Sequence, residues 1–174
     1  MTKDITENLL TIELKDGIVQ IELFSEDAPN HVERIKELAQ EGLYDGVAFH
    51  RVMEGFMAQT GDVKYGNSKD YDDNSVGTGG SDKPDLNAEF NERKHVRGTC
   101  SMARSNLPDS ANSQFFICFD TADFLDGEYT VWGQVIEGMD HVDQIKRGAS
   151  GSGSVTEPDI MVKVTPGKSS PKED

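Results

Sequence analysis

The side chains that usually carry acid, base or nucleophilic catalysis form no recognisable group in this sequence. The histidines lie apart from one another, at His31, His50, His95 and His141. Each is interpreted as a structural or solvated residue, and no GxSxG, HExxH or P-loop spacing occurs. Asp70–Asn74 resembles the start of a calcium loop, but Ser75 and Ser81 stand where such a loop needs Gly and Glu. We therefore expect neither a metal nor a cofactor.

Two polar side chains, Arg51 and Gln59, call for an explanation of another kind. Both lie in strand-like stretches that are dense with apolar residues, where a charged or amide side chain is costly unless it has a partner or a task. An arginine is always charged and presents a planar fork of donors. Arg51 could therefore serve a functional site, or it could form a buried ion pair with a nearby Asp or Glu.

Several segments around these two residues match the signature of a known family. They are Phe49–Val52, Gly55–Asp62, Gly77–Gly80, Ser101–Ala103, Ser113–Ile117 and Phe124–Gly127. In this order they closely resemble the cyclophilins, in particular bacterial members. The resemblance extends over nearly the whole chain, from about Asn8 to Val164, so chance is a poor explanation for it.

The resemblance implies a peptidyl-prolyl cis/trans isomerase that assists protein folding. Rotation about an X-Pro bond crosses a barrier of ~18–20 kcal/mol because it breaks amide resonance. A catalyst needs an apolar socket for the proline ring, groups that hold the flanking backbone, and a donor that favours the twisted amide. No covalent chemistry is required, and the expected partners are proline-containing polypeptides.

The resemblance also implies roles for individual residues. Arg51 would hydrogen-bond the substrate carbonyl and approach the proline nitrogen as resonance is lost. The expected socket consists of Phe56, Met57, Phe116 and Leu125. The other residues expected to contact the substrate are Gln59, Gly77, Ala103, Arg104, Ser105, Gln114, Phe124 and Tyr129. Taken singly, the apolar ones are more often core residues than ligand contacts, and Phe115 is expected in the core because adjacent strand residues face opposite sides.

Two other functions stay open on the sequence alone. A binding module could use the same groove to hold proline-containing segments, but it would need the aromatic socket and not a cation placed for the twisted amide. A β-barrel carrier of small apolar ligands would leave Arg51 and Gln59 without a shared purpose. The presence of Arg51 therefore favours the enzyme.

Composition and charge narrow the class of protein. The 174 residues carry a formal net charge of −15, which opposes binding to nucleic acid or anionic lipid because both need clustered Lys and Arg. No apolar run approaches the ~20 residues of a membrane span, and Met1–Asn8 lacks the features of a secretion signal. Cys100 and Cys118 are expected to be buried free thiols. We therefore expect a cytoplasmic monomer.

The first third of the chain predicts a hairpin followed by a helix. Apolar and polar residues alternate from Asn8 to Phe24 about the turn dipeptide Asp16–Gly17. Asp27 is then expected to cap an amphipathic helix of about four turns, with Pro29 in its first turn and Gly42 as its stop.

The rest of the chain predicts short strands separated by turns. A second apolar stretch runs from Val47 to Met57. Strand candidates follow at Gly98–Met102, Gln114–Phe119 and Thr130–Val135, with one last strand expected at Ile160–Val164. The polar segment from Lys64 to Pro84 is interpreted as a loop. The overlapping segment Val63–Val76 is interpreted as a tolerated surface insertion, with a binding surface particular to this chain as the alternative. A second helix is expected between Gly138 and Gly148.

Many short strands with few helices agree with the fold that the resemblance implies. That fold is mainly β: a closed, eight-stranded antiparallel β-barrel capped by two α-helices. The groove is expected on the outside wall, and the interior is expected to be packed with side chains. We expect one domain over residues 1–166 and a disordered tail over residues 167–174.

A first prediction concerns cyclosporin A. Phe124 stands where family members that bind this drug tightly usually have tryptophan, and Tyr129 where they usually have histidine. Because the indole N–H hydrogen bond is missing, we expect only weak binding of cyclosporin A in calorimetry. Catalysis is expected to survive, since neither position supplies the cation. A tight complex would contradict this expectation.

Overall fold

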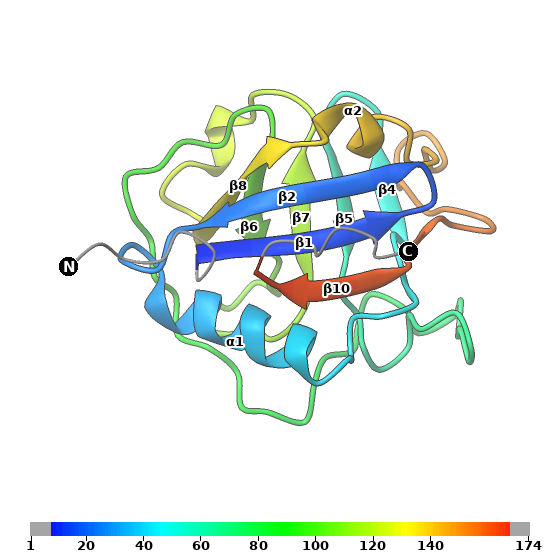
Figure 1. Cartoon of the computed structure of the whole chain (residues 1–174), viewed down its shortest axis with the longest axis horizontal. Helices are drawn as coiled ribbons and strands as arrows, with labels where there is room; N and C mark the ends of the chain where they lie inside the picture. Colours follow the sequence, from blue (N-terminus) through cyan, green and yellow to red (C-terminus); the bar gives the residue numbers. More distant parts are fainter. Residues whose placement is uncertain (1–7, 168–174) are drawn as a thin grey trace, which may run out of the picture.

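The computed structural model describes residues 8–167. Its strands wrap around an apolar interior, and a helix lies along one side of the sheet (Figure 1). The predicted disordered tail lies outside the described residues except for Gly167, whose N–H donates to the carbonyl oxygen of Leu9 at 2.6 Å.

Most of the strands overlap the stretches that the sequence predicts. They are β1 (Leu9–Leu14), β2 (Gly17–Leu23), β3 (Val47–Ala48), β4 (Arg51–Met53), β5 (Met57–Thr60), β6 (Thr99–Met102), β7 (Phe115–Cys118), β8 (Val131–Glu137), β9 (Ile160–Met161) and β10 (Lys163–Pro166). The helices are α1 (Pro29–Gln40) and α2 (Met139–Val142), with a 3-10 turn η2 (Asp123–Leu125). Each strand candidate overlaps at least one of these strands, but β8 extends two residues beyond Thr130–Val135, and β5 lies mostly beyond the apolar stretch Val47–Met57. The predicted loop from Lys64 to Pro84 contains no helix or named strand.

The expected closed barrel is wrong. Eight strands form an open sheet in the order β10-β1-β2-β8-β6-β7-β5-β4, and β3 pairs with β9 in a separate ladder. β3 precedes β4 along the chain and β9 precedes β10. Breaks at Phe49–His50 and at Val162 therefore interrupt the hydrogen bonding that would join the two edge strands. The mainly β character with two helices agrees with the prediction.

Helix α1 begins with the expected proline but is capped differently from the prediction. Pro29 is its first residue, and the residue at the N-cap position makes no side-chain hydrogen bond. Instead the N–H groups of Asn30 and His31 donate to the carboxylate of Glu89, at 3.1 and 2.9 Å. These N–H groups have no partner within the helix, so Glu89 takes the role that the sequence assigned to Asp27.

Two further details differ from the prediction. The register of the first hairpin pairs Leu14 with Gly17, so its loop consists of Lys15 and Asp16. Helix α2 is only four residues long, because the chain after it must return to β4, where the N–H of Gly148 donates to the carbonyl oxygen of Val52 at 2.8 Å.

The interior of the sheet is filled by side chains. The rings of Tyr44, Phe115 and Trp132 are fully buried and meet edge to face, with centroids 5.6 Å apart for Tyr44 and Phe115 and 5.2 Å apart for Phe115 and Trp132. The prediction that Phe115 is a core residue is confirmed. Cys100 and Cys118 are buried free thiols, as expected.

A glycine at the start of α2 provides a test of the packing. Gly138 has φ of 90°, and a Cβ there would overlap the carbonyl oxygen of Ile18. We expect Gly138→Ala to lower the free energy of unfolding by about 3 kcal/mol in urea denaturation. Gly151→Ala is the matched control, because its φ is 91° but nothing lies within 4 Å of the added Cβ; a loss of about 1 kcal/mol is expected there. Equal losses would contradict the assigned overlap.

Candidate active site

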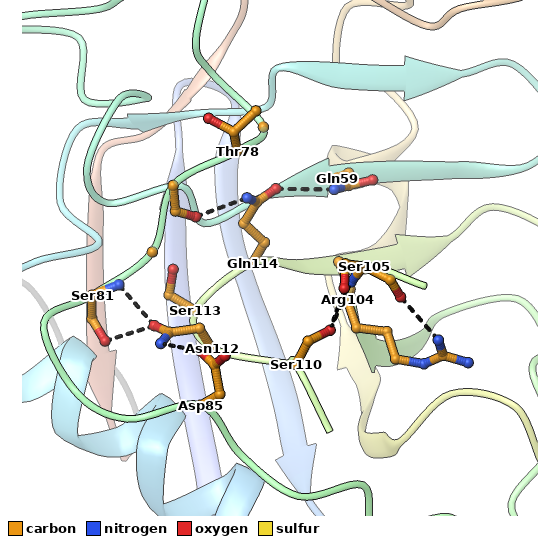
Figure 2. Close-up of a pocket in the computed structure, with 14 residues that line it drawn as sticks. Gln59, Thr78, Ser81, Asp85, Arg104, Ser105, Ser110, Asn112, Ser113 and Gln114 are labelled. Atoms are coloured by element: carbon orange, nitrogen blue, oxygen red, sulfur yellow. Dashed lines mark hydrogen bonds between the residues drawn. The ribbon is translucent and has the colours of Figure 1, made fainter. Parts of the chain in front are cut away.

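All the site residues expected from the sequence line two adjoining cavities. The socket cavity has a volume of about 290 Å³ and is lined by Arg51, Phe56, Met57, Gln59, Ala103, Arg104, Phe116, Phe124, Leu125 and Tyr129. The polar cavity, about 600 Å³, is lined by Gln59, Gly77, Thr78, Gly79, Gly80, Ser81, Asp85, Ala103, Arg104, Ser105, Ser110, Asn112, Ser113 and Gln114 (Figure 2). Gln59, Ala103 and Arg104 line both cavities, so the two form one groove.

The socket forms on the outward-facing side of β7, a strand whose side chains are buried on both faces. Successive residues of β7 face opposite ways, so Phe115 and Ile117 belong to the main core, whereas Phe116 and Cys118 belong to a separate cluster. Met57 on β5 joins that second cluster. The socket therefore lies on the outer face of the sheet, where the sequence predicted the groove.

The exposed fractions divide the socket into a floor and a rim. Met57, Phe116 and Leu125 are 2%, 5% and 8% exposed and form the floor. Phe124 is 68% exposed and stands at the rim, with its ring 5.5 Å from that of Phe56. A proline ring placed on this floor would lose contact with water on its inner side.

Arg51 lies at the edge of the socket in a defined cross-strand row. The register places Arg51 opposite Gln59, and Gln59 opposite Phe116, so the three side chains share one face. Arg51 Nη1 donates to Gln59 Oε1 at 3.1 Å, and Nε donates to the carbonyl oxygen of Ser152 at 3.2 Å. None of the ion pairs found in residues 8–167 includes Arg51, so the alternative of a buried ion pair is not supported.

A relay of amides connects Arg51 to the polar cavity. Gln59 Nε2 donates to Gln114 Oε1 at 3.0 Å, and Gln114 Nε2 donates to the carbonyl oxygen of Gly79 at 2.9 Å (Figure 2). Each bond fixes the direction of the next amide. The oxygen of Gln59 therefore faces Arg51 and holds the guanidinium in place.

The glycine-rich wall of the polar cavity is ordered by one buried carboxylate. Asp62 is fully buried. Its Oδ1 accepts the N–H groups of Lys64 and Tyr65 at 3.1 and 2.9 Å, and its Oδ2 accepts those of Gly77 and Gly79 at 2.7 and 2.9 Å. A loop that looks flexible by composition is thereby held in one conformation.

Asn112 holds the end of the glycine-rich segment, at Ser81, in place. Its Oδ1 accepts the backbone N–H and the hydroxyl of Ser81, both at 2.7 Å, and its Nδ2 donates to Asp85 at 3.1 Å (Figure 2). Arg104 lies with its guanidinium over the Tyr129 ring, 4.5 Å from the ring centroid. Hydrogen bonds within the protein, to Asp62 and to Asn112, therefore hold the lining of the polar cavity in place without a substrate.

Sequence reasoning missed the residues that support the groove rather than line it. Asp62 and Asp126 lie inside the quoted motifs, but their carboxylates gave no signal of a task. His95 was interpreted as structural or solvated; it is fully buried and bonded to Asp126. Such partners lie far apart in the sequence, and no local pattern joins them.

Comparison with known proteins agrees with this geometry. The family model described as "Cyclophilin type peptidyl-prolyl cis-trans isomerase/CLD" matches residues 9–166. The chain belongs to the cyclophilin family. Similar relatives include a probable peptidyl-prolyl cis-trans isomerase of Brucella suis, 58% identical over 91% of this chain and 82% of the relative. Peptidyl-prolyl cis-trans isomerase B of Escherichia coli is 36% identical over 82% of this chain and 87% of the relative.

Solved cyclophilin structures share the fold. Cyclophilin AquaCyp293 from Hirschia baltica superposes with a TM-score of 0.77 at 30% identity and covers 92% of this chain and 74% of its own. A Cryptosporidium parvum cyclophilin, solved in the presence of the dipeptide Ala-Pro, has a TM-score of 0.80 at 25% identity and covers 92% of this chain and 99% of its own.

Two further findings concern only residues 8–167. No helix there is long and apolar enough to cross a bilayer. No group of three or more His, Cys, Asp or Glu side chains is arranged to hold a metal ion.

The burial of His50, the residue before Arg51, can be tested by measuring how the free energy of unfolding changes in acid. His50 is 7% exposed. Burial lowers the pKa of His50 to about 4, so the unfolded chain binds a proton that the folded chain does not. Stability is therefore full above the unfolded pKa and is lost as the pH falls toward the folded one.

We expect the wild type to lose about 2 kcal/mol of unfolding free energy through His50 between pH 7 and pH 5. Urea denaturation at the two pH values, with His50→Asn beside the wild type, measures this. The variant is expected to show a pH dependence that is smaller by that amount. An unchanged pH dependence would mean that His50 is not held neutral by the fold.

Proposed function

We propose that the groove accelerates rotation about X-Pro peptide bonds, with Arg51 as the catalytic residue. The observation that carries the proposal is the position of an always-charged guanidinium at the edge of an apolar socket, held by Gln59 and Ser152 and not by a carboxylate. The presence of Ala-Pro in a cyclophilin structure of the same fold supports proline-containing polypeptides as substrates.

The socket would bind the proline ring and exclude water from one side of the reacting bond. Met57, Phe116 and Leu125 form its buried floor. Burying the ring there is favourable at roughly 25 cal/mol per Å² of apolar surface. This binding serves planar and twisted amides alike, so it positions the substrate without lowering the barrier by itself.

Arg51 would lower the barrier by favouring the twisted amide. When resonance is lost, the proline nitrogen regains a localised lone pair and becomes an acceptor, whereas in the planar amide it accepts nothing. A hydrogen bond from a charged donor contributes about 1.5–3 kcal/mol, and each 1.36 kcal/mol changes a rate tenfold. One such bond, formed only in the twisted state, would accelerate rotation by roughly 10- to 100-fold.

The amide relay would hold the substrate chain that precedes proline. Gln59 and Ala103 line both cavities, and Gln114, which accepts a hydrogen bond from Gln59, lines the polar cavity. Their polar groups are already oriented, so little ordering is needed when an extended backbone binds. Fixing the chain on one side of the bond lets the other side turn about it.

The rival functions fit less well. A barrel carrier would need an open interior, whereas Trp132, Phe115 and Tyr44 fill it. A binding module remains the alternative to be tested. The other expectations, a cytoplasmic monomer that assists folding and binds cyclosporin A weakly, belong to this proposal and stay predictions.

Arg51→Ala is expected to lower kcat/KM for an Ala-Pro-Phe peptide about 100-fold, because the donor to the twisted amide is lost. Arg51→Lys should recover only part of this, since an ammonium lacks the planar fork. Exchange NMR gives the isomerisation rate, and titration of the same peptide gives its affinity, which should change only a few-fold.

Arg97→Ala is the matched control, because Arg97 is an exposed arginine that pairs with Asp143 and lines neither cavity. It should retain the wild-type rate. Peptide binding by the wild type without acceleration would refute the isomerase and favour the binding module.

A further inference from the structure

A single short turn supplies two residues of the socket. The turn η2 presents Phe124 and Leu125 to the socket cavity. Its own backbone bonds are of the i to i+3 type, from Leu125 N–H to the Ala122 carbonyl oxygen at 3.0 Å and from Asp126 N–H to that of Asp123 at 3.1 Å. A 3-10 turn of this length has little stability of its own. Its position must therefore come from contacts with another part of the chain.

His95 makes those contacts at both ends of the turn. Its carbonyl oxygen accepts the N–H of Ala122 at 2.9 Å. At the other end, the backbone N–H of His95 donates to Asp126 Oδ1 at 2.7 Å, and His95 Nδ1 lies 3.0 Å from the same oxygen. One residue thus brackets the segment that carries Phe124 and Leu125.

The ring of His95 also reaches the opposite side of the socket. It is fully buried and stacks on Phe116, with centroids 6.1 Å apart and an angle of 18° between the planes. Its Nε2 lies 2.9 Å from Ser101 Oγ, and Ser101 is the cross-strand neighbour of Phe116. The ring therefore links the strand that carries Phe116 to the turn that carries Leu125.

The hydrogen-bonding needs of the ring agree with this placement. The Asp126 carboxylate can only accept, so the Nδ1 position carries the proton. Burial lowers the pKa of His95, so the ring is neutral at neutral pH. Nε2 then faces the Ser101 hydroxyl, whose one proton lies between Nε2 and the carbonyl oxygen of Thr130, 3.0 Å from Ser101 Oγ. Every polar atom of the ring has a partner, as a rigid spacer requires.

We propose that His95 is a positioning residue of the isomerase: with Asp126 it clamps η2 against Phe116 and thereby sets the distance between the two sides of the proline socket. The inference rests on the proposed function. Because η2 carries socket residues and not Arg51, loosening the clamp would weaken proline binding more than it would slow the rotation of bound substrate.

The test is His95→Phe, which keeps a ring for stacking on Phe116 and removes both side-chain hydrogen bonds. We expect KM for an Ala-Pro-Phe peptide to rise about tenfold with a smaller change in kcat, since displacements of about 1 Å around a site have effects of this order or larger. The amide NMR signals of Phe124 and Leu125 should shift in the free protein.

His31→Phe is the matched control, because His31 is equally buried and its Nδ1 lies 2.6 Å from Glu89 Oε1, yet it lines neither cavity. It should keep the wild-type kcat and KM per folded molecule. If His95→Phe does not fold, Asp126→Ala removes the same pair from its partly exposed side and should raise KM likewise.

A KM for His95→Phe within about twofold of the wild type would overturn the inference, as would an equal rise in His31→Phe. Lack of acceleration by the wild type would instead refute the proposed function. The amide signals of Phe124 and Leu125 would then still decide whether His95 holds the turn, because an unchanged position of both signals would contradict the clamp.

Discussion

The site depends on one strand that has to be apolar on both faces. β7 contributes Phe115 and Ile117 to the interior and Phe116 and Cys118 to the socket cluster. Packing of the core therefore fixes the position of the socket floor, because the core side chains and the socket side chains are attached to the same strand. The neighbouring strand β5 repeats the arrangement, with Ala58 inside and Met57 outside. A catalytic groove with a rigid floor follows from the same burial that stabilises the fold.

Local patterns in the sequence predicted most of the strands, and the resemblance to the cyclophilins predicted the residues of the groove. Alternation located the first hairpin, and the site residues that the resemblance implies all line the two cavities. Features that depend on distant partners were not accessible in this way. The barrel is open because of breaks between β3 and β4 and between β9 and β10, and no turn signal marks a break inside an apolar stretch. The cap of α1 comes from Glu89, which is 58 residues from His31.

Three carboxylates accept backbone N–H groups and so stabilise the structure, a role that composition alone does not indicate. Asp62, Glu89 and Asp126 each accept one or more backbone N–H groups from a segment without regular pairing of its own. An acidic chain carries most of its charge as solvated surface, but these three side chains replace the ladder bonds that loops lack. The oxygen atoms of these carboxylates order the glycine-rich wall, the start of α1, and His95, which contacts both ends of η2. The groove therefore keeps its shape although loops form much of it.

The outer edge of β4 is already occupied. The N–H of Val52 donates to the carbonyl oxygen of Gly153 at 2.8 Å, and the carbonyl oxygen of Val52 accepts the N–H of Gly148 at 2.8 Å, so residues 148–154 lie along the strand that carries Arg51. An unprotected strand edge can pair with any extended chain through its backbone N–H and carbonyl groups. Because residues 148–154 already pair with this edge, an extended chain that reaches the groove cannot add to the sheet beside Arg51.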